Sequence, residues 1–236
     1  MGQKLIKRNL NMGIIVSALA LLLTTLVGGI GDIVSFINEI IRLSRSYSLF
    51  QFSGFFTLFG SVVFPFLTFV ANLIFVFYVF KGYKNGKDLI GAVRFGVLII
   101  SEIFSFIYGL IAAFVFGNVG TNNILSYIWL FVSPVVAIVC YAVAAFGIIK
   151  NNKIVLLGAT GLLCFGPLAN LIYRFILYVG IYGIPFNFAI KNLGIFDFFI
   201  TGIAALSLVA FAFFAFSKKD VIASEDFEEN GIVEEV

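Results

Sequence analysis

Six long apolar runs constrain this chain more than any other feature. They cover Met12–Ile30, Phe55–Phe80, Leu89–Phe116, Ile124–Ile149, Ile154–Val179 and Leu193–Phe216. A helix needs about 20 apolar residues to cross about 30 Å of hydrocarbon, and the runs are close to this length or exceed it. They lack the alternation that barrel strands show, so each run is expected to be a helix. The sequence therefore predicts an all-α polytopic membrane protein, a bundle of six transmembrane helices.

The composition supports this fold class and sets the domain organisation. Of the 236 residues, 61% are hydrophobic and 11% are charged, whereas a soluble domain carries about 25% charged residues. The chain cannot cover so much apolar surface with charge, so its main partner is expected to be the lipid bilayer. Residues 1–217 are predicted to form the transmembrane domain. Residues 218–236 are predicted to be an acidic, disordered cytoplasmic tail.

The positions of Lys and Arg predict the orientation. One side of the six runs carries Lys4, Lys7, Arg8, Lys81, Lys84, Lys87, Lys150, Lys153, Lys218 and Lys219, and the other side carries Arg42, Arg45, Arg174 and Lys191. Arg94 is expected to snorkel to the first side. Because basic loops stay in the cytoplasm, the sequence predicts a multi-pass protein of the cell membrane. Both termini are expected to be cytoplasmic and residues 117–123 external.

A regular spacing suggests that the six helices form three hairpins. Lys81, Lys150 and Lys218 follow the even-numbered runs at steps of 69 and 68 residues. Pro65 and Pro134 stand sixteen residues before the first two of these lysines. The spacing fits an internal repeat of about 68 residues, although chance matches are common in so biased a composition. Whether the hairpins are true duplicates stays open at this point.

The segment after the first run has an amphipathic pattern. In residues 30–47, "IGDIVSFINEIIRLSRSY", isoleucines and Val34 fall on one helical face and polar residues on the other. Such a pattern is typical of a helix at a membrane surface. It predicts either a separate interfacial helix or a continuation of the first span, which would seal the bundle or bind a partner.

A glutamate stands near the middle of the third run. Glu102 lies fifteen residues after Lys87 and fifteen before Gly117, which places it about 22 Å along a helix from the basic side. A carboxylate at that depth costs at least about 2.5–3.5 kcal/mol, so it is expected to face the bundle. Pro65, Pro134 and Pro167 lie at similar depth, and a proline inside a helix frees a backbone carbonyl.

These residues and their polar neighbours form a candidate substrate or ion site near the midplane. Its members are Glu102, Ser105, Pro65, Thr68, Asn72, Pro134, Pro167 and Asn170. Broken helices and buried acids are typical of transporter binding sites. The alternative is structural: a protonated Glu and a few hydroxyl groups also join helices through hydrogen bonds.

Several kinds of chemistry have no support in the sequence. Histidine is absent, which excludes His-based catalysis and His-ligated metals, and Cys140 and Cys164 both lie in apolar runs. "GYKNGKD" (82–88) lacks the spacing and the Ser or Thr of a phosphate-binding loop. No cofactor, metal site, nucleic-acid partner or enzymatic activity is expected.

The function predicted from these features is small-molecule or ion transport, or service as the membrane subunit of a transporter. In that case Glu102 would be the titratable or coordinating group. The alternative is a non-transporting accessory or structural protein that binds other membrane proteins, or a further copy of itself, through its helix faces.

Overall fold

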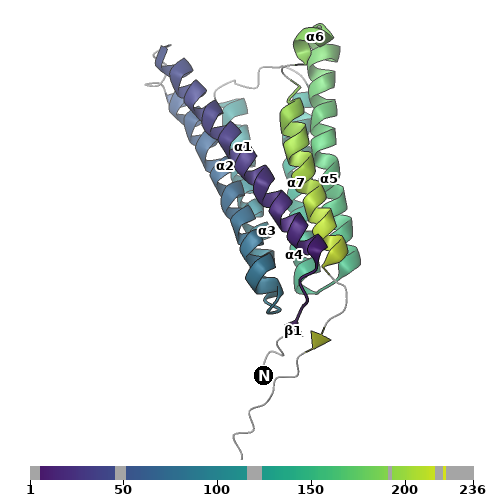
Figure 1. Cartoon of the computed structure of the whole chain (residues 1–236). Coiled ribbons are helices and arrows are strands. Elements are labelled where there is room, and N and C mark those ends of the chain that lie inside the picture. Colours follow the sequence, from purple (N-terminus) through teal and green to yellow (C-terminus); the bar gives the residue numbers. More distant parts are fainter. Residues whose placement is uncertain (1–5, 46–51, 116–123, 191–192, 216–219, 222–236) are drawn as a thin grey trace, which may run out of the picture.

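The computed structural model describes residues 6–45, 52–115, 124–190, 193–215 and 220–221 (Figure 1). Within these ranges the regular structure is helical, except for one antiparallel pair of two-residue strands, β1 (Ile6–Lys7) and β2 (Asp220–Val221). Six of the helices are long and apolar enough to cross a membrane. The predicted all-α class and the six spans are thus confirmed. Of the predicted tail, only the two residues of β2 lie within the described part.

The long helices match the predicted runs closely. They are α1 (Met12–Arg45), α2 (Phe52–Phe77), α3 (Asp88–Phe114), α4 (Ile124–Ile149), α5 (Lys153–Phe175) and α7 (Ile195–Phe214). A π-helical turn extends α2, η2 (Tyr78–Tyr83), and another extends α5, η3 (Ile176–Ile181); the short α6 (Phe186–Ala189) precedes α7. Pro65, Pro134 and Pro167 lie inside α2, α4 and α5.

The amphipathic segment is a continuation of the first span. Helix α1 runs without a break for 34 residues, which corresponds to about 51 Å of helix. This length exceeds the hydrocarbon thickness of about 30 Å, so the helix must tilt strongly or extend beyond the bilayer. Of the two alternatives that the sequence allowed, a separate interfacial helix is wrong.

The six long helices pack in a ring that follows the order of the chain. Each helix packs mainly against its neighbours in sequence, and α7 closes the ring by packing against α1. The contacts between successive helices continue around the ring, so packing does not divide the bundle into separate hairpin units. The three-hairpin arrangement and the repeat therefore stay predictions.

The two ends of the ring differ in packing. We call the end formed by the starts of α1, α3 and α5 the proximal end, and the opposite end the distal end. Figure 1 shows α1 and α7 close together near the proximal end and diverging toward the distal end. The large side chains that are fully buried lie in the proximal half and include Phe75, Tyr78, Tyr83, Phe95 and Phe211. The core of the protein is thus displaced toward the proximal end.

In the distal half of the long helices, burial is confined to small residues. The described helix segments there are 25–45, 54–70, 102–114, 124–139, 161–181 and 195–206. Within these segments the buried residues are Gly54, Gly60 and Ala113. The distal half thus contributes few large apolar side chains to a shared core.

Candidate functional site

The most unusual polar group in the bundle is Arg94 on α3. Its side chain is 3% exposed, and its guanidinium donates to Asn72 Oδ1 on α2 from Nε at 3.3 Å and from Nη2 at 2.9 Å. The expectation that Arg94 snorkels to the basic side is therefore wrong. Asn72 lies eleven residues before Tyr83, the last residue of η2, or about 16 Å of helix from the proximal end. The guanidinium thus reaches toward the middle of the bundle.

A chain of hydrogen bonds fixes the orientation of Asn72. Asn72 Nδ2 donates to Thr25 Oγ1 on α1 at 2.9 Å, and Thr25 Oγ1 donates to the Leu21 carbonyl at 2.7 Å. Because the amide nitrogen is engaged with Thr25, the amide oxygen faces Arg94. The network joins α1, α2 and α3, and it presents an acceptor to the charge inside an apolar bundle.

Two aromatic rings enclose the Arg94 guanidinium. The Arg94 Cζ atom lies 5.1 Å from the centroid of the Phe75 ring and 4.9 Å from that of Phe95. Both distances are within the range of cation–π attraction, which strengthens where water is excluded. The rings therefore offset part of the cost of burying the charge.

One nitrogen of Arg94 has no partner. Nη1 is buried and meets no hydrogen-bond acceptor in the structure. The ion pairs between described residues are Arg8–Asp88, Arg42–Glu39 and Arg174–Asp197, so no carboxylate of the described chain neutralises Arg94. The site is thus a buried positive charge that keeps hydrogen-bond donors unused.

Glu102 lies on the same helix as Arg94, farther toward the distal end. The two residues are eight positions apart, which is about 12 Å along the helix axis. Glu102 and Ser105 are both half-buried, and neither side chain makes a hydrogen bond or ion pair among the described residues. Tyr141 on α4 lies beside Phe95 of α3, with the centroids of the two rings 6.2 Å apart.

The other predicted site residues are distributed over three helices. Pro65 is half-buried and Thr68 exposed on α2, while Pro134 on α4 and Pro167 and Asn170 on α5 are half-buried. No described hydrogen bond or ion pair joins these five residues to Arg94 or Glu102. Of the eight predicted members, Asn72 is the one that the structure brings into contact with a buried charge.

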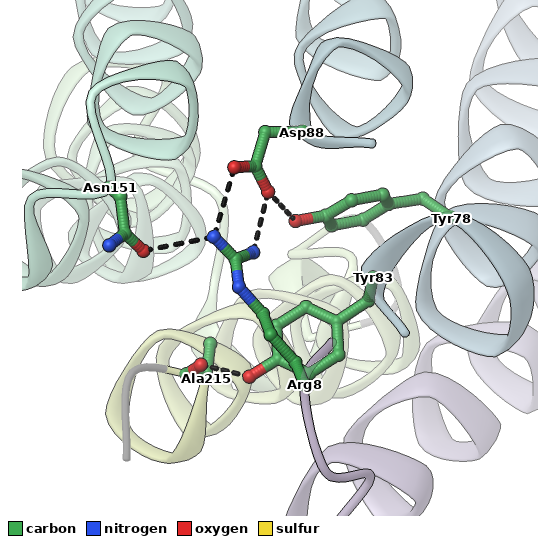
Figure 2. Close-up of polar contacts among 6 residues, drawn as sticks. All are labelled: Arg8, Tyr78, Tyr83, Asp88, Asn151 and Ala215. Carbon is green, nitrogen blue, oxygen red and sulfur yellow. Dashed lines mark hydrogen bonds and ion pairs between the residues drawn. The ribbon is translucent and has the colours of Figure 1, made fainter. Parts of the chain in front are cut away.

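A second polar cluster closes the proximal end, as Figure 2 shows. Arg8, which precedes α1, forms a bidentate ion pair with Asp88 at the start of α3, at 2.5 Å and 2.9 Å, and donates to Asn151 Oδ1 at 3.2 Å. Tyr78 donates to Asp88 at 3.0 Å, and Tyr83 donates to the carbonyl of Ala215. The cluster ties the N-terminal segment to α3, to the α4–α5 turn and to the end of α7.

The charge of Arg8 is stabilised by this environment. Arg8 is 3% exposed, and its burial disfavours the charged form. The hydrogen bond to Asp88 and the attraction of that carboxylate outweigh this penalty, so the pKa of the Arg8 guanidinium is raised above its ordinary value. The Arg8 guanidinium is therefore protonated at any physiological pH.

Sequence reasoning missed Arg94, Thr25, Arg8 and Asp88. A usable signal existed for Asp88, because it is the one acidic residue in the proximal segments before residue 220, where ten basic residues gather. For Arg94 the depth of its position on α3 favoured snorkelling. The same long side chain that allows snorkelling can equally well extend toward Asn72.

No protein-family model matches the chain, and no curated protein or solved structure matches it at significant similarity. The functional argument therefore depends on the residues themselves.

Proposed function

We propose that this integral membrane protein transports a small molecule or ion, or forms the membrane subunit of a transporter. One observation carries the proposal: Arg94 is buried beside Asn72 and Thr25, well inside the span of α3. Ionisable residues inside a membrane span are costly, and they commonly belong to substrate or ion pathways. A charge needed only for packing would be paired with a carboxylate, and Arg94 has no such pair among the described residues.

Glu102 is the second ionisable group in this proposal. It lies on α3 between the Arg94 cluster and the distal end, and it is half-buried without a hydrogen-bond partner among the described residues. Both properties suit a group that coordinates a passing substrate or changes its protonation during transport. Ser105, one turn farther, adds a hydroxyl group on the same helix.

The orientation follows from the charge distribution. Ten basic residues lie at the proximal side of the spans and four at the distal side, so we place the proximal end and both termini in the cytoplasm of a cell-membrane protein. The distal end then faces outward; residues 117–123, which the sequence predicts to be external, lie outside the described part of the chain. The Arg8–Asp88 cluster closes the cytoplasmic end of the ring in this orientation.

The repeat spacing bears on the same proposal. If three hairpins are copies of one unit, a threefold pseudo-axis along the membrane normal would relate them, as parallel repeats do in other transporters. Three hairpins arranged around such an axis would place each helix beside its neighbours in sequence and α7 beside α1. The observed helix contacts agree with this. Substrate sites in such proteins lie near the midplane, and the residue count along α3 favours that depth for Glu102.

A non-transporting accessory protein is the alternative. The long amphipathic α1 extends farther than a bilayer requires, and its distal part could bind another membrane protein or a second copy of this chain. We propose no enzymatic activity, because the short connections at the proximal end leave no room for a cytosolic active site.

The proposal can be tested without knowing the substrate. The protein is purified in mild detergent and small molecules and proteins that accompany it are identified by mass spectrometry. It is then reconstituted into liposomes, and solid-supported-membrane currents are recorded after concentration jumps of sodium phosphate, sodium acetate and potassium chloride. A bound small molecule, or a current that Glu102→Gln alters, supports transport.

A different set of results would identify the protein as a non-transporting accessory protein. A stoichiometric protein partner, no bound small molecule and no current above that of empty liposomes would assign the chain to the accessory class. Thr201→Val serves as the matched control for Glu102→Gln, because Thr201 is exposed on α7 and bonds only to carbonyls of its own helix among the described residues.

A further inference from the structure

We propose that Arg94 is the binding point for an oxyanion, either a carboxylate or a phosphate group. This inference rests on the proposed transport function, because it names the chemical class of the ligand that the same site would take. It depends on the unused donors of a buried guanidinium and on the absence of a counter-ion for it among the described residues.

The hydrogen-bond inventory of Arg94 points to an acceptor that is still missing. A guanidinium has five N–H groups in one plane. Nε and Nη2 each donate to Asn72 Oδ1, whereas both hydrogens of the buried Nη1 have no acceptor. A buried donor without a partner is costly, and a charged one more so. An acceptor placed at Nη1 would remove that cost.

The charge of the site selects an anion over a neutral or cationic ligand. Among the described residues, the group that accepts hydrogen bonds from Arg94 is the neutral amide of Asn72. That amide in turn donates to the neutral hydroxyl of Thr25. A buried charge without a counter-ion is strongly destabilising, and a paired one much less so. The Cα atom of Glu102 lies about 12 Å along the helix from that of Arg94, and Glu102 is not among the residues that form ion pairs in the described part of the chain.

The shape of the donor selects an oxyanion among anions. Arginine presents parallel N–H groups that match the two oxygens of a carboxylate or phosphate, and such pairs are strong as well as specific. The Phe75 and Phe95 rings lie 5.1 Å and 4.9 Å from the Arg94 Cζ atom, and the Arg94 side chain is 3% exposed. In such surroundings a charged hydrogen bond is worth more than in water.

Direct binding to the full-length protein tests the assignment. Radiolabelled inorganic phosphate and acetate are titrated onto the delipidated protein in detergent. We expect saturable binding of at least one of them, with one site per chain. Arg94→Gln should weaken it at least about 30-fold, as loss of one member of a buried charge pair does. Arg174→Gln is the matched control, since Arg174 is half-exposed near Asp197, and should leave binding unchanged.

A conservative variant keeps the test decisive if Arg94→Gln does not fold. Arg94→Lys retains the charge and loses the fork, so we expect folded protein whose affinity is reduced about tenfold. Absence of saturable phosphate and acetate binding in the wild type would overturn the proposal. Equal binding by Arg94→Lys and wild type, or by folded Arg94→Gln and wild type, would overturn it too.

The phosphate group could belong to a lipid or to a free solute. Mixed micelles containing phosphatidylglycerol distinguish these sources. One tightly bound phosphatidylglycerol per chain that excludes free phosphate, and that Arg94→Gln releases, supports the oxyanion site with a lipid headgroup as its ligand. Free phosphate or acetate binding that phosphatidylglycerol does not displace supports a soluble ligand.

The failure of this inference can be separated from the failure of the transport proposal. Arg94-dependent binding without any flux in liposomes would reject transport and keep the oxyanion site. Flux of a cation or neutral solute that is unchanged in Arg94→Lys, with no phosphate or acetate binding, would keep transport and reject the site.

Discussion

The proximal and distal halves of the ring are built on different principles. In the proximal half, the buried core contains side chains from all six long helices. Arg8 also contacts Asp88 at the start of α3 and Asn151 in the α4–α5 turn, and Arg94 bonds to Asn72. In the distal half of the same helices, the buried residues within the described segments are Gly54, Gly60 and Ala113. The same six helices thus share a buried core at one end, whereas at the other end neighbouring helices meet in pairs through partly exposed aromatic contacts such as Phe56–Tyr108 and Trp129–Tyr173.

Helix α2 shows this difference along a single face. Asn72, Thr68, Pro65 and Ser61 follow one another at helical spacing on that face. Asn72 is buried, Thr68 is exposed, and Pro65 and Ser61 are half-buried. A face that belonged to a uniformly packed interior would be buried along its whole length. The polar stripe thus runs from half-buried and exposed positions to the buried Arg94 cluster.

The largest effect is expected from breaking the proximal ion pair. Asp88→Ala leaves Arg8 buried without its carboxylate, which should lower the free energy of unfolding by about 3–5 kcal/mol. Unfolding in mixed detergent micelles, followed by circular dichroism, measures the loss.

The distal pair provides the matched control. Asp197 also lies in the first turn of its helix, but its contact with Arg174 is 3.8 Å long and its side chain is 67% exposed. Asp197→Ala should therefore cost less than about 1 kcal/mol. Equal losses for the two variants would remove the distinction between the two halves.

The next effect concerns the Arg94 cluster itself. Asn72→Leu removes the acceptor of two bonds from a charged group and should cost about 2–3 kcal/mol in the same assay. Thr68→Leu, one turn away on the same face, should change the stability by less than about 0.5 kcal/mol because Thr68 is exposed. A large loss for Thr68→Leu would mean that the distal half is packed more tightly than its burial indicates.

A smaller effect on stability is expected when a methyl group is added to a glycine that packs against a neighbouring helix. A Cβ on Gly147 would lie 2.9 Å from the backbone nitrogen of Leu156 on α5, so Gly147→Ala should separate α4 from α5 and cost about 1–3 kcal/mol. A Cβ on Gly29 of α1 meets nothing within 4 Å. Gly29→Ala should be neutral or slightly stabilising, because alanine favours helix more than glycine. The two variants are compared by their unfolding midpoints in detergent.

The smallest effect concerns the two thiols. Cys140 and Cys164 are free, on the neighbouring helices α4 and α5, and they are buried and half-buried. Both should react slowly with a membrane-impermeant maleimide, with Cys164 the faster of the two in detergent, since reactivity follows exposure of the thiolate. Rapid labelling of Cys140 in intact liposomes would indicate water next to the proximal core.

Most of the fold could be predicted from sequence because membrane helices carry a strong signal. The apolar run Ile124–Ile149 coincides with α4 residue for residue, and the other runs differ from their helices mainly at the ends. The continuation of α1 to Arg45 was one of two predicted alternatives. The sequence could not choose between them, since an amphipathic pattern is the same for a separate helix and an extended one.

The candidate site was predictable only in part. Counting residues from the loops gives the depth of a Cα atom, and helical spacing from Pro65 and Thr68 was enough to select Asn72. It does not give the direction of a long side chain, so Arg94 was assigned to the basic side although its guanidinium reaches Asn72. Arg8 pairs with Asp88, eighty residues away. This contact depends on how the helices pack in the ring, and a local sequence pattern cannot predict that packing.

The central claim is that the polar face of α2 forms a water-accessible path from the distal end to Arg94. The most direct test is to measure whether water-soluble reagents reach this face. Thr68→Cys and Asn72→Cys are made in a background in which Cys140 and Cys164 are replaced by Ala. Each variant is treated in liposomes with a membrane-impermeant methanethiosulfonate from either side. We expect fast labelling of Thr68→Cys from the distal side and slow labelling of Asn72→Cys from both sides. Labelling of Thr68→Cys by a lipid-soluble maleimide, but not by the impermeant reagent, would show that this face contacts lipid and would contradict a path to Arg94.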